Sequence, residues 1–162
     1  MAQAVRFLRL LTLIESIAAA TAYAAMAAVL IADVVGREVF GSGVFGAQKM
    51  AVYGAVIAAF LGLSLATASN THLRPAFLDP VLKGLMVDRF GDALSALFFL
   101  AMAWFGINFV MQSMEYQDRA AVLYWLLWPI QLIIPYALVS TAIRHAAFAI
   151  WPDLKPKPEA PA

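Results

Sequence analysis

Four stretches of the chain are almost free of charged side chains and are long enough to cross a membrane. A hydrocarbon core of about 30 Å needs about 20 helical residues, each rising 1.5 Å. Lipid offers no hydrogen-bond partner to the backbone, so each stretch must close its own bonds as a helix, and the alternation typical of barrel strands is absent. The predicted spans cover residues 12–35, 49–71, 92–114 and 120–143.

The uncharged centre of the first span is bracketed by Glu15 and Asp33. Their separation corresponds to about 27 Å along a helix, so we expect the two carboxylates at opposite water interfaces. No ionisable group lies within the centre of any predicted span. Carriers coupled to protons or sodium usually need intramembrane carboxylates, broken helices or paired repeats, so this chain alone is not expected to be the pump.

The distribution of Lys and Arg predicts the orientation, because cytoplasmic loops carry an excess of these residues. On the side of the termini lie Arg6, Arg9, Arg74, Lys83, Arg89, Arg144, Lys155 and Lys157. The other side holds Arg37, Lys49 and Arg119. We therefore expect cytoplasmic termini in a multi-pass protein of the bacterial inner membrane, with the connections 33–49 and 115–119 facing the periplasm.

The connection between the second and third spans has a pattern of its own. Residues 79–90 begin at an Asp-Pro start signal and carry apolar side chains on one helical face, namely Val81, Leu82, Leu85, Met86 and Phe90. Such a segment is predicted to lie flat in the lipid headgroup layer, and a loop helix packed on protein is the alternative. The proline-rich tail, 149–162, is predicted to follow a single four-helix membrane domain, 1–148, without a fold of its own.

Composition supports a membrane protein and excludes several kinds of partner and reactive group. Hydrophobic residues make up 64% of the chain and charged residues 13%, far from the balance of a soluble domain. A net charge of +1 without a basic face gives no reason to expect a nucleic-acid partner. The absence of cysteine excludes disulfides and thiol nucleophiles. We expect neither enzymatic activity nor a metal site or cofactor.

Two sets of residues are candidates for protein contacts. Small side chains recur every four residues at Gly54, Ala58, Gly62 and Ala66, which predicts a closely packed helix from a partner or from this chain. Charged side chains on the outer face could meet a periplasmic partner, namely Arg37, Glu38, Lys49, Glu115, Asp118 and Arg119. An alternative for Arg37 is an ion pair with Asp33, four residues earlier. Uncharged polar groups within the spans are expected to pack helices: Thr21, Ser64, Thr67, Asn108 and Ser140.

Three motifs in this order resemble one transporter family. They are D-V-V-G-R at 33–37, L-G-L-S-L-A-T-A-S-N-T-H-L-R at 61–74 and P-I-Q-L-I-I-P-Y at 129–136. The chain resembles, over about residues 8–148, the small membrane subunit (DctQ-like, Q subunit) of tripartite ATP-independent periplasmic (TRAP) transporters.

The resemblance implies two protein partners, a large TRAP membrane subunit and a periplasmic substrate-binding protein. It implies uptake of an organic acid with sodium coupling in the large subunit, and a small subunit that acts as a scaffold and helps to dock the binding protein. Two other functions remain open from the residues. A b-type cytochrome or quinone-linked anchor would use His72 and His145, and a small exporter or channel would need several copies of the chain.

Overall fold

The computed structural model describes residues 2–69 and 85–156, and within them every regular element is helical. The elements are α1 (Ala2–Phe40), α2 (Ala47–Ala68), α3 (Leu85–Glu115), α4 (Trp128–Gln131), α5 (Ile133–Ile150) and the short 3-10 helix η2 (Pro152–Leu154). Four segments of the described chain are long and apolar enough to span a membrane, α4 and α5 together forming the last. This confirms the predicted all-α membrane fold.

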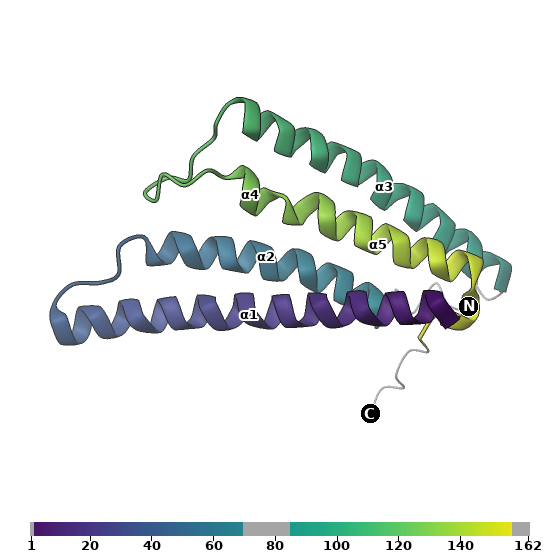
Figure 1. Cartoon of the computed structure of the whole chain (residues 1–162), viewed down its shortest axis with the longest axis horizontal. Helices are drawn as coiled ribbons and strands as arrows, with labels where there is room; N and C mark the ends of the chain where they lie inside the picture. The colour runs from purple at the N-terminus through teal and green to yellow at the C-terminus, as the bar shows by residue number, and fades with distance from the viewer. Residues whose placement is uncertain (1, 70–84, 157–162) are drawn as a thin grey trace.

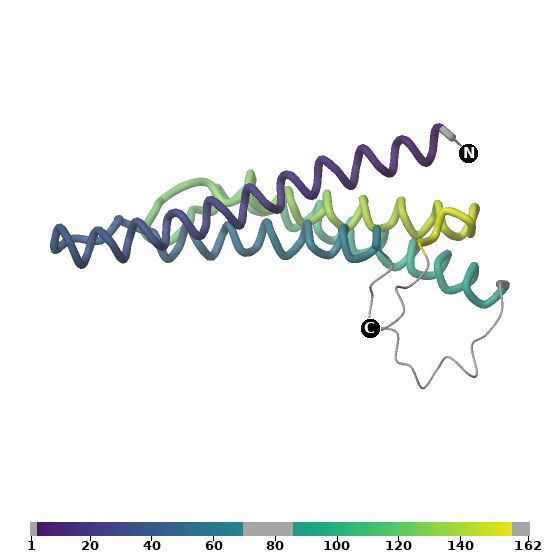
Figure 2. The backbone as a smooth tube through the Cα atoms, turned by 90° about the horizontal axis from the view of Figure 1, so that it is seen from below, coloured from purple at the N-terminus to yellow at the C-terminus, as the bar shows by residue number. Residues whose placement is uncertain are grey.

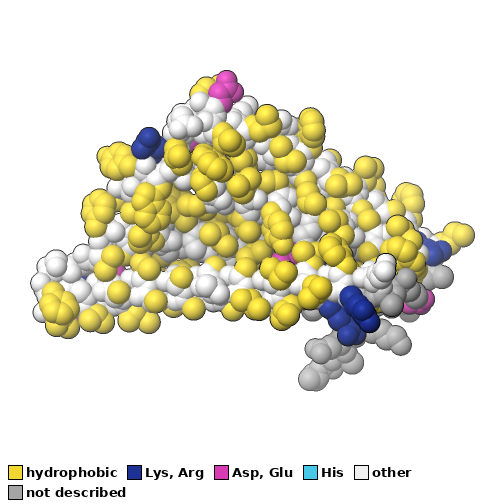
Figure 3. Space-filling view, in the orientation of Figure 1, with side chains coloured by type: hydrophobic (Ala, Val, Ile, Leu, Met, Phe, Trp, Pro, Cys, Tyr) yellow, Lys and Arg dark blue, Asp and Glu magenta, His cyan; other side chains and the backbone are white. Residues whose placement is uncertain are grey.

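The helices form two antiparallel hairpins that lie side by side. α2 packs against both α1 and α5, and α5 packs in turn against α3 (Figure 1). The turns that join α1 to α2 and α3 to α4 lie at one end of the bundle, opposite the N-terminus and the last turns of α5 (Figure 1). Hydrophobic side chains cover most of the face seen in Figure 3, with Lys and Arg towards the ends. Such a surface suits a bundle surrounded by lipid.

One seam of α1 faces the rest of the bundle, and its inward positions alternate by three and four residues. They are Glu15, Ala19, Ala22, Met26, Val29 and Asp33, all buried or half-buried. Against this seam α2 places Gly54, where an added Cβ would lie 3.3 Å from the Cβ of Met26. The small side chains on both helices therefore permit close packing.

α1 is longer than its predicted span, 12–35. Its 39 residues correspond to about 58 Å, nearly twice the hydrocarbon thickness. Glu15 consequently lies well inside the helix rather than near one end. The expectation that Glu15 and Asp33 both face water is wrong, since their exposed fractions are 0% and 6%.

The fourth helical segment begins later than the predicted span, 120–143. Residues 116–127 form a compact connection with an isolated bridge between Arg119 and Leu126, and the helix starts at Trp128. Pro129 suits a first helical turn because its missing N–H is not needed there. Pro135 leaves the carbonyl of Gln131 without its helical donor, and the helix is interrupted directly after that residue, between α4 and α5.

The described part of the predicted interfacial segment is continuous with α3. Leu85 is the first residue of α3, and the side chains of Met86 and Phe90 are 85% and 72% exposed on its first turns. Val81 and Leu82 lie outside the described residues. A separate helix over 79–90 therefore stays a prediction, although from Leu85 onwards the helix runs into the third span without a break.

Candidate functional sites

A polar cluster joins α1 to α5 inside the bundle. We call it the Glu15–Arg144 cluster, and its members are Thr12, Glu15, Tyr136, Ser140 and Arg144. Arg144 Nη2 lies 2.6 Å from Glu15 Oε2, and both side chains are buried, with exposed fractions of 1% and 0%. The remaining members bond to other polar atoms of this ion pair, whereas Arg144 Nε is buried and has no hydrogen-bond partner among the described residues. A buried charge pair of this kind is stable only when hydrogen bonds complete it.

The helix periods explain how the cluster assembles. Tyr136, Ser140 and Arg144 are four residues apart and lie on one stripe of α5. The hydroxyls of Ser140 and Tyr136 donate to Glu15 Oε1, at 2.5 Å and 3.3 Å. Arg144 Nη2 also donates to Thr12 Oγ1, at 3.2 Å, one turn before Glu15 on α1. The cluster therefore fixes the position of α1 relative to α5.

The sequence contained a signal for this cluster that the span boundaries concealed. Arg144 directly follows the predicted fourth span, where it counts as a cytoplasmic flanking charge, and Glu15 is expected at a water interface. Polar residues recur at spacings of four at Tyr136, Ser140 and Arg144, which marks a polar stripe on one face of a helix. That Glu15 lies opposite this stripe follows only from the packing of the helices.

A second polar cluster lies where α3 begins and α5 ends. Asp92, 5% exposed, accepts a hydrogen bond from Lys155 Nζ at 2.6 Å, and its other oxygen lies 3.1 Å from His145 Nδ1. The His145 ring also stacks on Phe99, with centroids 5.7 Å apart. Asp92 thus connects α3, α5 and the segment after η2. His72, the other imidazole of the cytochrome alternative, lies outside the described residues.

The turn after α1 is organised around Asp33. Arg37 pairs with this carboxylate, and the backbone N–H of Val44 donates to Asp33 Oδ1 at 2.9 Å. Gly43 lies against both side chains, and a Cβ there would clash with Asp33 Oδ1 and lie 3.0 Å from Arg37 Cγ. A larger residue at position 43 would therefore displace the Asp33 carboxylate, and the turn favours glycine there.

A cavity of about 350 Å³ opens beside this turn. Arg37, Gln48, Lys49 and Val122 are among the residues that line it, so the connection 116–127 contributes one wall. The structure brings Arg37 and Lys49 to the same cavity. The other candidate charges do not line it and are exposed: Glu38, Glu115, Asp118 and Arg119. Arg119 donates to the carbonyl of Tyr124, at 3.3 Å, within its own connection.

The predicted small-residue stripe of α2 is buried over only part of its length. Gly54 contacts α1, and Ala58 is buried with an exposed fraction of 3%. Ala66 is half-buried, whereas nothing lies within 4 Å of a Cβ added at Gly62. The structure thus places part of the stripe inside the bundle and leaves open space at Gly62.

The polar residues of the spans divide into two groups. Ser64 and Ser140 bond between helices, Ser64 to the carbonyl of Ala137 at 3.2 Å and Ser140 within the Glu15–Arg144 cluster. Thr21, Thr67 and Asn108 donate to the carbonyl one turn earlier on their own helices. The bonds of the first group favour helix packing, as expected.

The fold and these sites define a multi-pass membrane protein whose buried carboxylates are held by other parts of the same chain. Among the described residues, no group of three or more His, Cys, Asp or Glu side chains could hold a metal ion. Comparison with protein families gives the particular class. A family model described as "Tripartite ATP-independent periplasmic transporters, DctQ component" matches residues 26–153. The chain belongs to this family and is a small membrane subunit of a TRAP transporter. No curated protein matches it.

Proposed function

We propose that this subunit is a rigid brace for the large membrane subunit of its transporter. In this proposal the large subunit carries out sodium-coupled uptake of an organic acid, and the brace gives it a fixed wall in the bacterial inner membrane. Membership of a family of tripartite transporter components supports a partnership of this kind. The division of labour places transport chemistry in the partner.

One observation carries the proposal: each buried carboxylate of the described residues ties two or more segments of this chain together. Glu15 ties α1 to α5, Asp33 ties α1 to the turn that follows it, and Asp92 ties α3 to α5 and to Lys155. A transported ion or substrate would have to compete with these internal partners. Removing one partner of a buried pair costs about 3 to 5 kcal/mol, so the paired arrangement favours a static role.

The outer end of the bundle is proposed to help dock the periplasmic binding protein. Lys49 is exposed at the cavity beside the turn and has no ion pair among the described residues, so it is available to an acidic partner surface. Arg37 lines the same cavity but already pairs with Asp33. Charges at the rim of an interface mainly raise the association rate and orient the partner. Lys49 is therefore the better candidate of the two for contact with the binding protein.

Uptake by the assembled transporter tests the brace. Cells that lack this subunit but retain the large subunit and the binding protein are compared with cells that hold the intact system. Both are screened for growth on single organic acids. Uptake of the labelled acid that the intact system supports is then measured. We expect uptake to fall to background and to return when this chain is supplied. Unchanged uptake without the chain, at equal levels of the large subunit, would show that no brace is required.

The docking role has a separate test. Lys49→Glu should reduce the initial uptake rate at low concentrations of binding protein and should have less effect when the binding protein is saturating. Arg6→Glu, a charge reversal of an exposed residue at the opposite end of the bundle, is the matched control. Equal effects of the two variants, or none from Lys49→Glu, would argue against docking at this end.

A further inference from the structure

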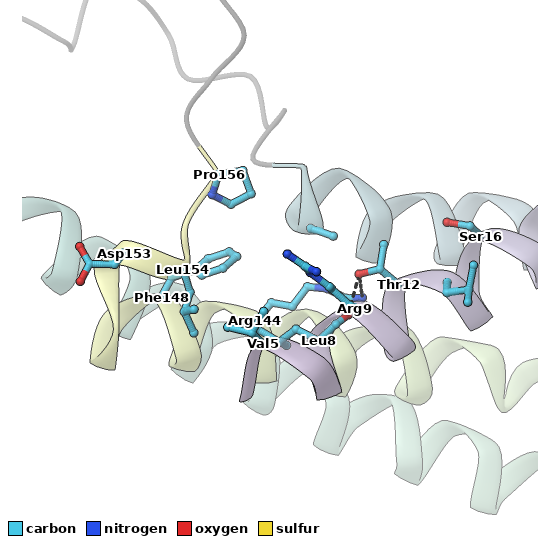
Figure 4. Close-up of a pocket in the computed structure, with 12 residues that line it drawn as sticks. Val5, Leu8, Arg9, Thr12, Ser16, Arg144, Phe148, Asp153, Leu154 and Pro156 are labelled. Atoms are coloured by element: carbon cyan, nitrogen blue, oxygen red, sulfur yellow. Dashed lines mark hydrogen bonds between the residues drawn. The ribbon is translucent and has the colours of Figure 1, made fainter. Parts of the chain in front are cut away.

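A second cavity, of about 640 Å³, lies at the end of the bundle that holds the N-terminus. It exists because α1 diverges from the other helices towards its N-terminus (Figure 2). The cavity is bounded by α1, by Ala68 at the end of α2, by the last turns of α5, and by the segment Leu154 to Pro156 (Figure 4). Its level therefore coincides with the end of a membrane-spanning helix, where lipid headgroups meet the hydrocarbon core.

One wall of this cavity is a polar stripe on α1. Arg9, Thr12 and Ser16 follow one another at helical spacing and all line the cavity. Arg9 is exposed and makes no hydrogen bond or ion pair with any described residue. Thr12 contacts Arg144 from the cavity wall (Figure 4). The Thr12 hydroxyl already donates to the Leu8 carbonyl, at 2.9 Å, so Ser16 supplies the hydroxyl donor of this stripe. An unpaired guanidinium beside such a hydroxyl is suited to bind the oxygens of a phosphate group.

The other walls are mostly apolar. Val5, Leu8 and Leu13 on α1 face Phe148 on α5 and Leu154 beyond it. On the other side of α1, a groove of about 270 Å³ continues this apolar surface, with Phe7, Leu8, Ile143 and Trp151 among its lining residues. A free phosphate ion would gain nothing from these walls, whereas acyl chains would bury apolar area against them.

From this juxtaposition we propose that the cavity binds a phosphate-bearing anion, and that its source is a membrane phospholipid. The phosphate lies against Arg9 and Ser16, and the acyl chains follow the apolar side chains of α1 and α5. Arg144 contributes little net charge because Glu15 neutralises it, so Arg9 is the cation that selects the anion. Asp153 also lines the cavity, but its carboxylate is directed away from Arg9 at the opposite end (Figure 4).

Native mass spectrometry of the full chain, purified in a mild detergent with any subunit that stays bound, tests this site. Phosphatidylglycerol is titrated against diacylglycerol with the same acyl chains, which lacks only the phosphate headgroup. We expect one retained phosphatidylglycerol, bound at least about tenfold more tightly than diacylglycerol, because charge-assisted hydrogen bonds are the strong ones. Arg9→Gln should abolish this preference. Arg6→Gln removes a neighbouring exposed charge that does not line the cavity and should retain it.

The arms of the experiment separate the two sources of phosphate. Excess inorganic phosphate should fail to displace the lipid, and displacement at modest concentration would show that a free anion is the ligand. An equal loss of lipid in Arg6→Gln and Arg9→Gln would show that general surface charge holds the lipid, and it would contradict a specific site at Arg9. Equal binding of diacylglycerol and phosphatidylglycerol to the unmodified chain would also overturn it. The outcome is independent of whether this subunit acts as a brace.

Discussion

The substitution Arg144→Met tests the energetic role of the Glu15–Arg144 cluster. Methionine keeps much of the apolar volume of the arginine but leaves Glu15, which is completely buried, without its cation. Ser140 and Tyr136 would still donate to the carboxylate, so their hydrogen bonds cover only part of the loss. Breaking a buried pair from one side costs about 3 to 5 kcal/mol. For a protein of this size, we expect the midpoint of thermal unfolding to fall by about 6 to 20 °C.

The assay is thermal unfolding in detergent, followed by the fluorescence of the four tryptophans. The double variant Glu15→Leu with Arg144→Met removes both charges and should recover most of the lost stability, because apolar replacement of a whole buried pair is often neutral. Arg6→Gln, an exposed position, should leave the midpoint unchanged. A fall of less than about 3 °C in the single variant, or no recovery in the double variant, would refute the reasoning.

Three further predictions use stability or labelling of the same chain. Gly54→Leu should lower the unfolding midpoint because its Cβ meets α1, while Gly62→Leu, which faces open space, should be tolerated; equal effects would contradict the packing described. Gly43→Ala should cost about 1 to 3 kcal/mol by disrupting the hydrogen bonds of a buried carboxylate, and an unchanged midpoint would count against this role of the turn. Asp92→Asn should weaken the contact between residue 92 and Lys155. A cysteine introduced at Leu154 in this cysteine-free chain should then react faster with maleimide. An unaltered labelling rate would show that the contact to Lys155 does not hold this segment.

The general fold could be predicted because long uncharged stretches in lipid have few alternatives to a helix. The residues at which the helices begin and end could be predicted less well. Pro129 and Pro135 both fall inside the predicted fourth span, 120–143, but Pro129 lies in the first turn of its helix, so the whole helical segment lies further towards the C-terminus than predicted. This shift also placed Arg144 inside α5 instead of beyond it.

The polar sites were harder to predict because burial depends on which helix lies opposite. Glu15 and Asp33 are eighteen residues apart, which is five helical turns, so both lie on the same face of α1. By hydropathy alone, the two carboxylates mark the ends of a membrane span. The packing of α1 along α2 instead turns their shared face towards the interior of the bundle. The pair Arg37 and Lys49 could be anticipated as neighbours at a turn, but the wall supplied by Val122 depended on the fold of a distant connection.

The composition of the purified complex tests the brace most directly. This chain is tagged at its N-terminus, extracted from membranes in a mild detergent, and its intact mass is measured by native mass spectrometry. We predict a stable complex of one copy of this chain with one copy of a large multi-pass subunit, which dissociates more readily in the Arg144→Met variant. Isolation of this chain as a monomer or as a homo-oligomer, with the large subunit recovered intact elsewhere, would contradict the brace.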